Sequence, residues 1–351
     1  MGGCRGGNET VSSADMAVLF AELDTRPLVK AVNASLAYYQ SLPPEQQFSL
    51  CGADISAAEQ IESLELFLNI AVQAETAAAF RQQITAHFSF CREPAGKEML
   101  ITGYYEPVFS GSLEKKEPYL YPLYGVPADL NDHSPYWTRA EIEKNHYLDG
   151  HELVYLKDRL DVFFLHIQGS GKVRLPDGSV RLLRYAANNG HPYRSIGKLL
   201  VEQGKLSREA VDLPAITAYL RNHPQELEEI LHHNERFIFF RMMDKEAKVD
   251  SQPPGSMGQP LTPGYSIALD QDYFATGSLA LLITEQPVFG AGNTEPRWQP
   301  LCRFVLNQDS GSAIKGTDRV DLFLGSGPEA AKTAGIMKQA GKLYFLHREK
   351  K

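Results

Sequence analysis

The segment NQDSGSAIKGTDRVDLFLG, residues 307–325, places carboxylates and a lysine among glycines, beside a run that is typical of a β-strand. Within that run, aliphatic residues recur at every second position: Val320, Leu322 and Leu324. A period of two sends alternate side chains to opposite faces of a strand. We therefore expect Asp321 to point away from the core, beside Phe323, and the segment to form the rim of an active site.

The composition is that of a globular protein large enough for two domains. The chain has 351 residues, of which 43% are hydrophobic, and a single core rarely organises so many residues. The 35 basic residues are outnumbered by 43 acidic ones, which leaves no positive excess to neutralise a phosphate backbone. We therefore expect no nucleic-acid partner, and a neutral polymer fits the charge balance better.

The sequence predicts neither a membrane-spanning segment nor a signal peptide. No run of about 18 apolar residues occurs, and the start lacks the charged and apolar regions of a secretory signal. Cys4 nevertheless follows small residues and precedes a flexible polar stretch, which is the arrangement at which bacterial lipoproteins are cleaved and acylated. The alternative is a remnant of an expression tag, and the sequence leaves both readings open.

The cysteines and histidines do not form a metal-binding pattern. Cys51, Cys91 and Cys302 lack the close pair spacing of a zinc site, and no His-Glu-x-x-His motif occurs. Cys51 and Cys91 either form a disulfide in an oxidising compartment or remain buried thiols. We expect neither a metal ion nor an organic cofactor.

The chain changes from a helical to a β-rich pattern along its length. Residues 13–91 carry apolar side chains at helical spacing, whereas strands and turns begin at Met99. Beyond Met99 we expect strands at 153–156, 162–167, 172–175, 180–183, 236–241, 265–269, 279–284, 301–306, 319–324 and 342–347, and helices at 193–203, 207–222, 226–232 and 329–340. Because a helical start and a β-rich end flank a different middle, we expect the middle to be inserted into a domain built from both termini.

The motif TGYYEP, residues 102–107, stands where the pattern first changes from helix to strand. Adjacent residues on a strand point to opposite faces, so one of Tyr104 and Tyr105 packs while the other lines a groove. Aromatic faces with hydroxyl tips suit sugars. Both tyrosines are equally compatible with a structural role.

A second motif, QGSG, runs from Gln168 to Gly171 at the end of the expected strand 162–167. It matches neither a nucleophile elbow nor a phosphate-binding loop. A glycine-flanked amide and hydroxyl allow a ligand to approach the backbone, although a plain turn is equally compatible. The segment YAANNG, residues 185–190, has the same polar character and offers the amides of Asn188 and Asn189.

Three aspartates come at strand ends or faces of the last β region: Asp270, Asp309 and Asp321. They could converge in one barrel-like domain, beside the glycine-rich loop that carries Lys315. Each aspartate taken singly is also typical of a turn.

Taken together, these motifs resemble the membrane-bound lytic murein transglycosylase A family, in particular its neisserial lipoprotein members. The resemblance covers most of residues 102–346. It rests on TGYYEP, QGSG, the segment Asn188-Asn189-Gly190 with residues 192–197, and the C-terminal block that contains the three aspartates.

The resemblance implies a mainly β fold with helices. One domain is expected to be a double-psi β-barrel with N-terminal helices, formed by residues 1–103 and 245–351. An inserted, β-barrel-like substrate-binding domain is expected at residues 104–244, with a groove between the two. The family also implies a lipoprotein on the periplasmic face of the outer membrane, anchored through Cys4, which acts on peptidoglycan glycan strands. We expect a monomer, with wall-synthesis proteins as candidate partners.

The activity that the resemblance implies is cleavage of the β-1,4 bond between N-acetylmuramic acid and N-acetylglucosamine, with formation of 1,6-anhydro ends. A hydrolase needs two carboxyl groups, but here the tethered 6-hydroxyl of the sugar is the nucleophile, so one suffices. By match to the family motif, Asp321 is the acid/base and Asp309 supports it. Substrate contacts are expected at Thr102, Tyr104, Tyr105, Gln168, Gly169, Ser170, Asn188, Asn189, Asp270 and Lys315.

The chain departs from the family pattern at Ser312, where glycine is commoner, and at Asp318, which adds a carboxylate near Asp321. Asp321 is preferred as the acid because Asp318 falls in the turn before the strand. Two other functions stay open. One is a non-catalytic, expansin-like protein that binds glycan and loosens the wall, and the other is a hydrolytic muramidase or endoglucanase that uses water.

Overall fold

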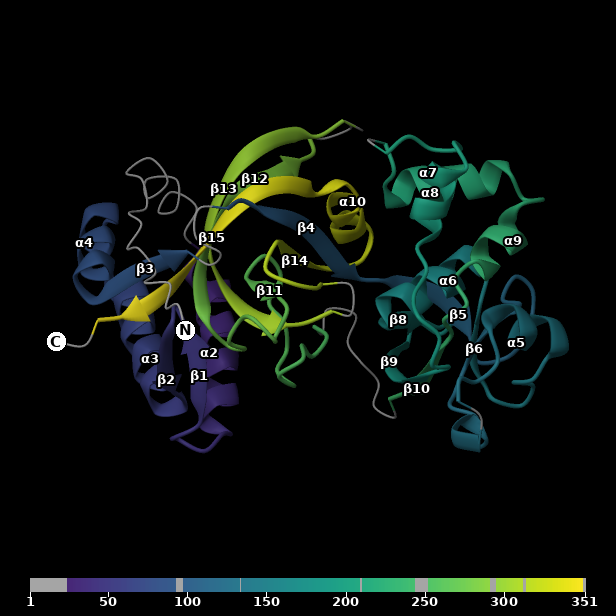
Figure 1. The fold of residues 1–351 in the computed structure, drawn as a ribbon, viewed down its shortest axis with the longest axis horizontal. Coiled ribbons are helices and arrows are strands. Elements are labelled where there is room, and N and C mark those ends of the chain that lie inside the picture. The colour runs from purple at the N-terminus through teal and green to yellow at the C-terminus, as the bar shows by residue number, and fades with distance from the viewer. Residues whose placement is uncertain are drawn as a thin grey trace, which may run out of the picture. The chain divides into compact units, whose positions relative to one another are not determined.

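The computed structural model describes residues 24–92, 97–132, 134–208, 210–243, 252–290, 295–311 and 314–349. The chain divides into two compact units (Figure 1). Unit 1 comprises residues 1–105, 252–325 and 332–351, and unit 2 comprises residues 106–251 and 326–331. Cys4 and the helical pattern expected over residues 13–23 lie outside the described residues.

Unit 1 combines helices with a β-barrel. Its elements are α2 (Thr25–Gln40), β1 (Gln47–Leu50), β2 (Ala53–Ser56), α3 (Ala57–Gln73), α4 (Ala77–His87), β3 (Phe88–Arg92), β4 (Met99–Glu106), β11 (Ser266–Ala268), β12 (Leu279–Val288), β13 (Arg297–Asp309), β14 (Arg319–Ser326), α10 (Pro328–Ile336) and β15 (Lys338–Arg348). β4 and β14 each end on a residue of unit 2, and α10 begins there.

Six strands close the barrel in the order β12, β13, β11, β14, β4 and β15, because β15 pairs back onto β12. The short β11 is parallel to β13 and antiparallel to β14. The long β15 pairs with three strands along its length. Lys338–Gly341 pair with β4, Lys342–Phe345 with β12, and Tyr344–Arg348 with β3. The closed barrel confirms the fold class predicted from the sequence.

Two cores lie on the two faces of the barrel strands. Phe304 of β13 meets the rings of Phe67 on α3 and Phe80 on α4, with centroids 4.8 and 5.8 Å apart. Its neighbour Val305 points the other way, into the second core. That core also contains Ile101, Ile267, Leu322 and Phe345. The period of two along β13 therefore divides helix-facing from barrel-filling side chains.

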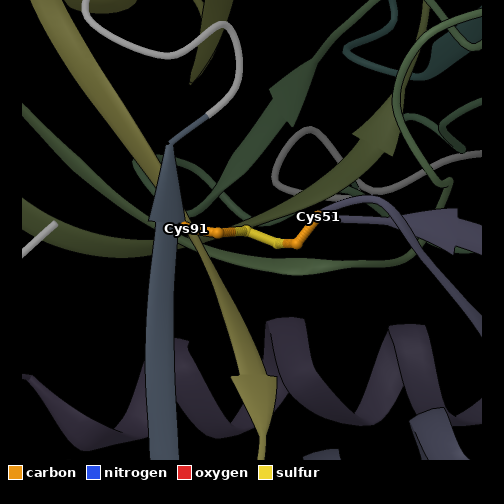
Figure 2. The surroundings of a disulfide bond; sticks show 2 residues. All are labelled: Cys51 and Cys91. Carbon is orange, nitrogen blue, oxygen red and sulfur yellow. A yellow bond between two sulfur atoms is a disulfide. The ribbon is translucent and has the colours of Figure 1, made fainter. Parts of the chain in front are cut away.

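A disulfide joins Cys51 to Cys91 (Figure 2), with the two Cα atoms 5.9 Å apart. Cys51 and Gly52 form the turn between β1 and β2, and both have positive φ angles, 58° and 73°. Cys91 lies on β3. The bridge thus attaches the β1–β2 hairpin to the outermost strand of the sheet, which decides between the two readings that the sequence left open.

Unit 2 is a six-stranded sheet with helices. Its elements are β5 (Val108–Ser112), β6 (Tyr121–Tyr124), η1 (Leu130–Asp132), α5 (Arg139–Asn145), β7 (Glu152–Leu156), α6 (Arg159–Gln168), β8 (Ser170–Arg174), β9 (Val180–Asn188), α7 (Ile196–Glu202), α8 (Leu213–Asn222), α9 (Leu227–His232) and β10 (Ile238–Met242). The strand order is β10, β9, β8, β5, β7 and β6, and the outer strands β10 and β6 approach each other.

The predicted strand at 162–167 is wrong, because these residues form most of helix α6. Asp158 caps the helix by accepting from the N–H of Leu160 at 2.9 Å. Gly169 ends it in the left-handed region at φ 72°. Burial of Leu160 and Phe163 on one face of the helix outweighs the β propensity of this β-branched and aromatic run.

The predicted helix at 329–340 is too long, because α10 ends at Ile336 and β15 begins at Lys338. An added Cβ at Gly341 would lie 2.5 Å from Ile101 Cγ1 and 2.8 Å from the carbonyl oxygen of Ile283. Gly341 is therefore needed for close packing between strands rather than as a helix cap.

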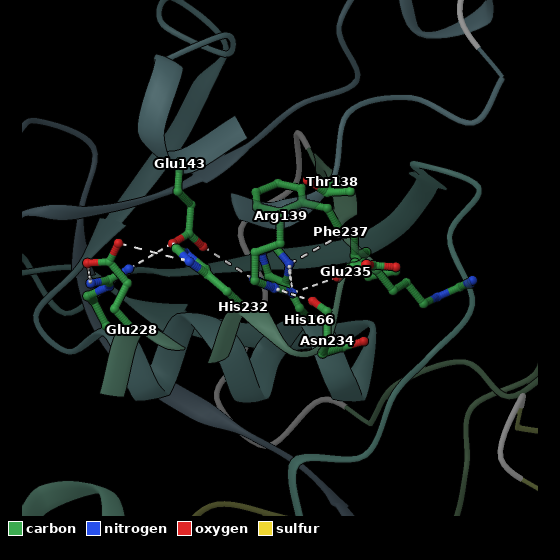
Figure 3. A network of polar contacts seen from close by, with 12 residues as sticks. Thr138, Arg139, Glu143, His166, Glu228, His232, Asn234, Glu235 and Phe237 are labelled. Carbon is green, nitrogen blue, oxygen red and sulfur yellow. Dashed lines mark hydrogen bonds and ion pairs between the residues drawn. The ribbon is translucent and has the colours of Figure 1, made fainter. Parts of the chain in front are cut away.

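Unit 2 contains a buried polar network around Arg139 (Figure 3). The guanidinium donates to the carbonyl oxygens of Asn234 and Arg236 and contacts His166 Nδ1 at 3.2 Å. Burial would raise the pKa of Glu143, but the hydrogen bond with His232 and the charges of Arg139 and nearby Arg159 lower it to about 2. Each buried ionic group in this network thus has a partner, as stability requires.

A second buried ion pair lies where β4 ends. The Glu106 carboxylate is 3.0 Å from Lys172 Nζ and 2.8 Å from Arg184 Nη1. It also accepts from the Ser326 hydroxyl at 3.1 Å. Because Glu106 ends β4 and Ser326 ends β14, this contact fastens the ends of two barrel strands to each other.

Candidate active site

The register of the barrel places Asp309 and Asp321 at the same level. Asp309 of β13 and Asp321 of β14 are both paired with Ala268 on the intervening strand β11. Neighbouring strands lie about 4.8 Å apart, so two steps separate the backbones of the two aspartates by roughly 10 Å. Paired residues point to the same face of a sheet, so both carboxyl groups occupy one region.

Asp321 is buried and held at both carboxylate oxygens. Its Oδ1 accepts from the Thr102 hydroxyl at 2.6 Å and from Arg319 Nε at 2.7 Å. Its Oδ2 accepts from Arg319 Nη2 at 3.0 Å. Thr102 lies on β4 and Arg319 lies two residues before Asp321 on β14, so adjacent strands supply both partners.

Asp309 has a separate set of partners. Its Oδ2 accepts from the Tyr104 hydroxyl at 2.8 Å, and its Oδ1 accepts from the backbone N–H of Ser256 at 3.0 Å. Burial raises the pKa of Asp309 above its ordinary value, although these hydrogen bonds oppose the shift. Within the described residues, no hydrogen bond joins Asp309 to Asp321, so any support from Asp309 is electrostatic or passes through Tyr104.

Tyr104 is hydrogen-bonded to Asp309 and lies close enough to Asp321 for its charge to act on the phenol. Its ring packs against Phe323 with centroids 5.2 Å apart. Burial raises the pKa of the Tyr104 phenol, and the charges of Asp309 and Asp321 add to that shift. Phe323 itself is fully buried, so the face of β14 that carries Asp321 is packed rather than open. The expectation that Asp321 points away from the core is therefore wrong, because both faces of the strand are covered.

Gly103 allows β4 to hold Thr102 and Tyr104 in place. An added Cβ at this position would lie 2.6 Å from Leu324 Cδ1 and 3.0 Å from the Cα of Ala334. A side chain here would push β4 away from β14 and α10. The glycine of TGYYEP is thus explained by close packing.

The Asp270 carboxylate binds the glycine-rich loop that contains Lys315 and Gly316. Its Oδ2 accepts from the N–H of Gly316 at 2.8 Å, and this hydrogen bond lowers the pKa of Asp270 although burial opposes it. The exposed Lys315 lies beside it, with Nζ 3.9 Å from Oδ1. Asp270 and Lys315 therefore form a pair at the base of the glycine-rich loop.

Asp318 is exposed and lies before β14, whereas Asp321 is buried within the strand. The Asp318 carboxylate accepts from the neighbouring Thr317 hydroxyl at 3.2 Å. Its carbonyl oxygen accepts from the N–H of Leu100 at 2.7 Å. These contacts are those of a turn. Ser312 lies outside the described residues.

The predicted site residues of unit 2 occupy the α6–β8 junction and the end of β9. Gln168 is exposed at the end of α6, Gly169 caps that helix and Ser170 begins β8. Asn188 donates to the Tyr185 hydroxyl at 2.6 Å and accepts from the N–H of Gly190.

Asn189 is buried, and its side-chain amide makes hydrogen bonds within the protein. Its amide donates to the carbonyl oxygens of Trp137 and Glu235 and accepts from the N–H of Phe237. This hydrogen bonding leaves no amide hydrogen of Asn189 for a ligand. Tyr105, the other tyrosine of the motif, is half-buried beside the end of β4.

Sequence reasoning missed two partners of the aspartates, Arg319 and the backbone N–H of Ser256. The alternation along β14 contained the signal for Arg319, because residues two apart on a strand share a face. No local signal indicated Ser256, which lies 53 residues before Asp309. Within the described residues, no group of three or more His, Cys, Asp and Glu side chains is arranged to hold a metal ion.

Two family models match the chain. The MltA specific insert domain matches residues 100–241, and the 3D domain matches residues 265–347. The membrane-bound lytic murein transglycosylase A of Vibrio cholerae serotype O1 is 34% identical over 252 residues, which are 71% of this chain and 65% of that protein. The chain thus spans about two thirds of the length of this curated relative, at 65%.

Solved structures agree with these matches. The lytic transglycosylase LtgG of Burkholderia pseudomallei is 33% identical with a TM-score of 0.60, and the match covers 92% of this chain and 91% of that one. The MltA of E. coli with bound chitohexaose is 26% identical with a TM-score of 0.73, over 92% and 91% of the two chains. The chain belongs to the MltA family, which confirms the resemblance seen in the sequence.

Proposed function

We propose that this protein is a peptidoglycan lytic transglycosylase, which cleaves the β-1,4 bond between N-acetylmuramic acid and N-acetylglucosamine and leaves 1,6-anhydro ends. The observation that carries the proposal is the buried Asp321 carboxyl group, held by Thr102 and Arg319 on two adjacent strands of the barrel. The names of the relatives in the MltA family, and the chitohexaose bound to the E. coli protein, support a glycan as the substrate.

In the proposed reaction, Asp321 gives a proton to the glycosidic oxygen as the bond from that oxygen to C1 breaks. The 6-hydroxyl of the same muramic acid residue forms the new bond to C1, and its proton returns to Asp321. No water is consumed, and the carboxyl group ends the cycle in its starting state. Asp309 and Tyr104 lie on the same side of the sheet and act on Asp321 through space.

The test compares the full chain with its Asp321→Asn and Asp318→Asn variants on purified sacculi. We expect anhydromuropeptides from the wild type and from Asp318→Asn, and none above background from Asp321→Asn. Mass spectrometry decides the reaction class, since products that are heavier by one water would indicate a hydrolase. Binding to sacculi without soluble product would indicate a non-catalytic wall-loosening protein, and full activity of Asp321→Asn would overturn the assignment of the acid.

We also propose that the protein works at the periplasmic face of the outer membrane. The support is the name of its curated relatives, which describes membrane-bound proteins. In the described part of the chain, no helix is long and apolar enough to cross a membrane. Acylation of Cys4 would supply the attachment, and mass spectrometry of the N-terminal peptide from the membrane fraction tests it.

A further inference from the structure

Arg319 occupies an unusual position for a residue next to a proton donor. Its guanidinium makes two hydrogen bonds to Asp321, from Nε to Oδ1 at 2.7 Å and from Nη2 to Oδ2 at 3.0 Å. Nη2 is also 3.4 Å from the Thr102 hydroxyl. An arginine that binds a carboxylate through two nitrogens fixes both its position and its plane.

The two oxygens of Asp321 are not equivalent. Oδ1 has two short contacts, from Thr102 and Arg319, whereas Oδ2 has a single longer one. A carboxylate oxygen has two lone pairs that can each accept one hydrogen. Both lone pairs of Oδ1 accept hydrogen bonds, whereas Oδ2 accepts one and keeps its second lone pair for a proton. The geometry therefore distinguishes an anchored oxygen from an oxygen that is able to exchange a proton with a sugar.

The arrangement follows from the strand itself. Arg319 and Asp321 are two residues apart on β14, so their side chains rise from the same face. The Arg319 side chain is 35% exposed and that of Asp321 is 11% exposed, so the guanidinium reaches the carboxylate from the solvent side. Arg319 is thus able to remain paired with Asp321 without being buried as an ion.

We propose that Arg319 is a positioning residue for the proton-transfer step: with Thr102 it anchors Oδ1 of Asp321, directs Oδ2 to the sugar, and stabilises the carboxylate that exists between loss and return of the proton. This inference rests on the proposed transglycosylase activity. When Oδ2 donates its proton to the leaving oxygen, the negative charge develops between the two donors of Arg319. An interaction that strengthens as charge develops lowers the barrier.

The charge of Arg319 acts together with the other groups that face Asp321. On β4 these are the Thr102 hydroxyl and the Tyr104 phenol, and on β13 the nearest titratable group is Asp309. The intervening strand β11 contributes Ala268, which carries no charge. Within the described residues, Arg319 is therefore the one cation that is hydrogen-bonded to the Asp321 carboxylate.

The experiment measures the rate of anhydromuropeptide release from sacculi against pH for Arg319→Gln and Arg319→Lys. Arg319→Gln removes the positive charge beside the carboxylate, so we expect the alkaline limb of the rate profile to move to higher pH. Its maximal rate falls by about tenfold to a hundredfold, because one preorganised donor pair is lost. Arg319→Lys keeps the charge but not the two-nitrogen geometry, so its alkaline limb stays near that of the wild type while its maximal rate is lowered.

Arg348→Gln is the matched control, because Arg348 also forms an ion pair with one carboxylate of unit 1, Glu62, at 2.7 Å, but far along β15 from the site. It should match the wild type in rate and pH profile. Binding of all variants to sacculi should be unchanged. If Arg319→Gln does not fold, the maximal rate and pH profile of Arg319→Lys test the inference.

Two outcomes overturn the inference. One is a wild-type rate and pH profile for Arg319→Gln, and the other is an equal loss of rate in both variants with no movement of the alkaline limb, which indicates a purely structural role. If the wild type itself releases no anhydro product, the proposed function fails and the inference fails with it. If the wild type is active and either of the two outcomes holds, only the role of Arg319 is refuted.

Discussion

Asp309 and Asp321 stand on the two strands that flank β11, each in register with Ala268, yet their carboxyl groups are bound by different partners. Asp321 is paired with a cation, Arg319, whereas Asp309 is bound by neutral donors, Tyr104 and the N–H of Ser256. The structure thus gives different surroundings to two residues for which the resemblance implies different roles.

Asp309→Asn should change how stability depends on pH. Burial raises the pKa of Asp309, so the folded chain keeps this proton to higher pH than the unfolded chain does. The stability that this group contributes is fully present below about pH 4, the ordinary value for aspartate, and is lost as pH rises through the folded-state pKa. The free energy of unfolding of Asp309→Asn, measured relative to wild type, should therefore increase with pH across this window.

Urea unfolding at several pH values between the acidic range and neutrality measures this difference. Asp272→Asn, at an exposed position close to Asp270, is the control and should show a constant difference from wild type. A pH-independent difference for Asp309→Asn as well would contradict the prediction. Anhydromuropeptide release should fall less in Asp309→Asn than in Asp321→Asn, because the amide oxygen still accepts from Tyr104.

Gly103→Ala should destabilise the protein and reduce activity together. The added methyl group would lie 2.6 Å from Leu324 Cδ1, so β4 or Leu324 must shift. Overpacking of this kind costs about 1–3 kcal/mol. Chemical denaturation provides the measurement, with Gly125→Ala as the control, since the nearest atom to a Cβ there is at an ordinary 3.5 Å. Equal effects of the two substitutions would argue against close packing at Gly103.

Lys172→Met should be strongly destabilising because it leaves Glu106 buried with fewer positive partners. Lys172 and Glu106 have side-chain exposures of 0% and 1%. Loss of one member of a buried ion pair lowers the free energy of unfolding by about 3–5 kcal/mol. We expect the lower end of this range for Lys172→Met, because Glu106 keeps its contact with Arg184.

The matched control is Lys198→Met, which breaks an exposed pair with Glu202 whose side chains are 77% and 60% exposed. Its effect should stay below about 0.5 kcal/mol. Thermal and urea unfolding of both variants test the contrast. Comparable values for Lys172→Met and Lys198→Met would show that the buried pair contributes little.

Removal of the disulfide by Cys51→Ala together with Cys91→Ala should lower stability by about 2–4 kcal/mol, because the bridge closes a loop across a sequence separation of 40. A reductant should lower the stability of the wild type towards that of the double variant and leave the variant unchanged. Cys302→Ala, which retains the bridge, should remain sensitive to the reductant. Insensitivity of the wild type to reductant would refute the prediction.

Most of the fold was predictable where local signals agree with the tertiary structure. The hairpin of β8 and β9 follows from the turn at Pro176-Asp177-Gly178. The helix predicted at 207–222 is too long at its start, because Asp212 caps α8 and the helix begins at Leu213. The strand predicted in place of α6 shows the limit of this approach. The run 162–167 has β-branched and aromatic residues, and the helix becomes evident only when Asp158 and Gly169 are read as its two caps.

The candidate site was predictable in its aspartates but not in its contacts. Asp321 and Thr102 are 219 residues apart, and nothing in either motif specifies that they share a hydrogen bond. The packed face around Phe323 was likewise hidden, because alternation along β14 predicts which residues share a face but not that both faces are covered in a closed barrel.

The pairing of β15 has a consequence for the order of assembly. A chain that stops short of Lys338 lacks the strand that joins β4 to β12, so β4 keeps its pairing with β14 but the barrel has no strand to close it. Contacts between segments so distant in sequence form late and slowly in folding. During synthesis, the barrel would therefore close only after this strand has left the ribosome, although every candidate site residue precedes it in the chain.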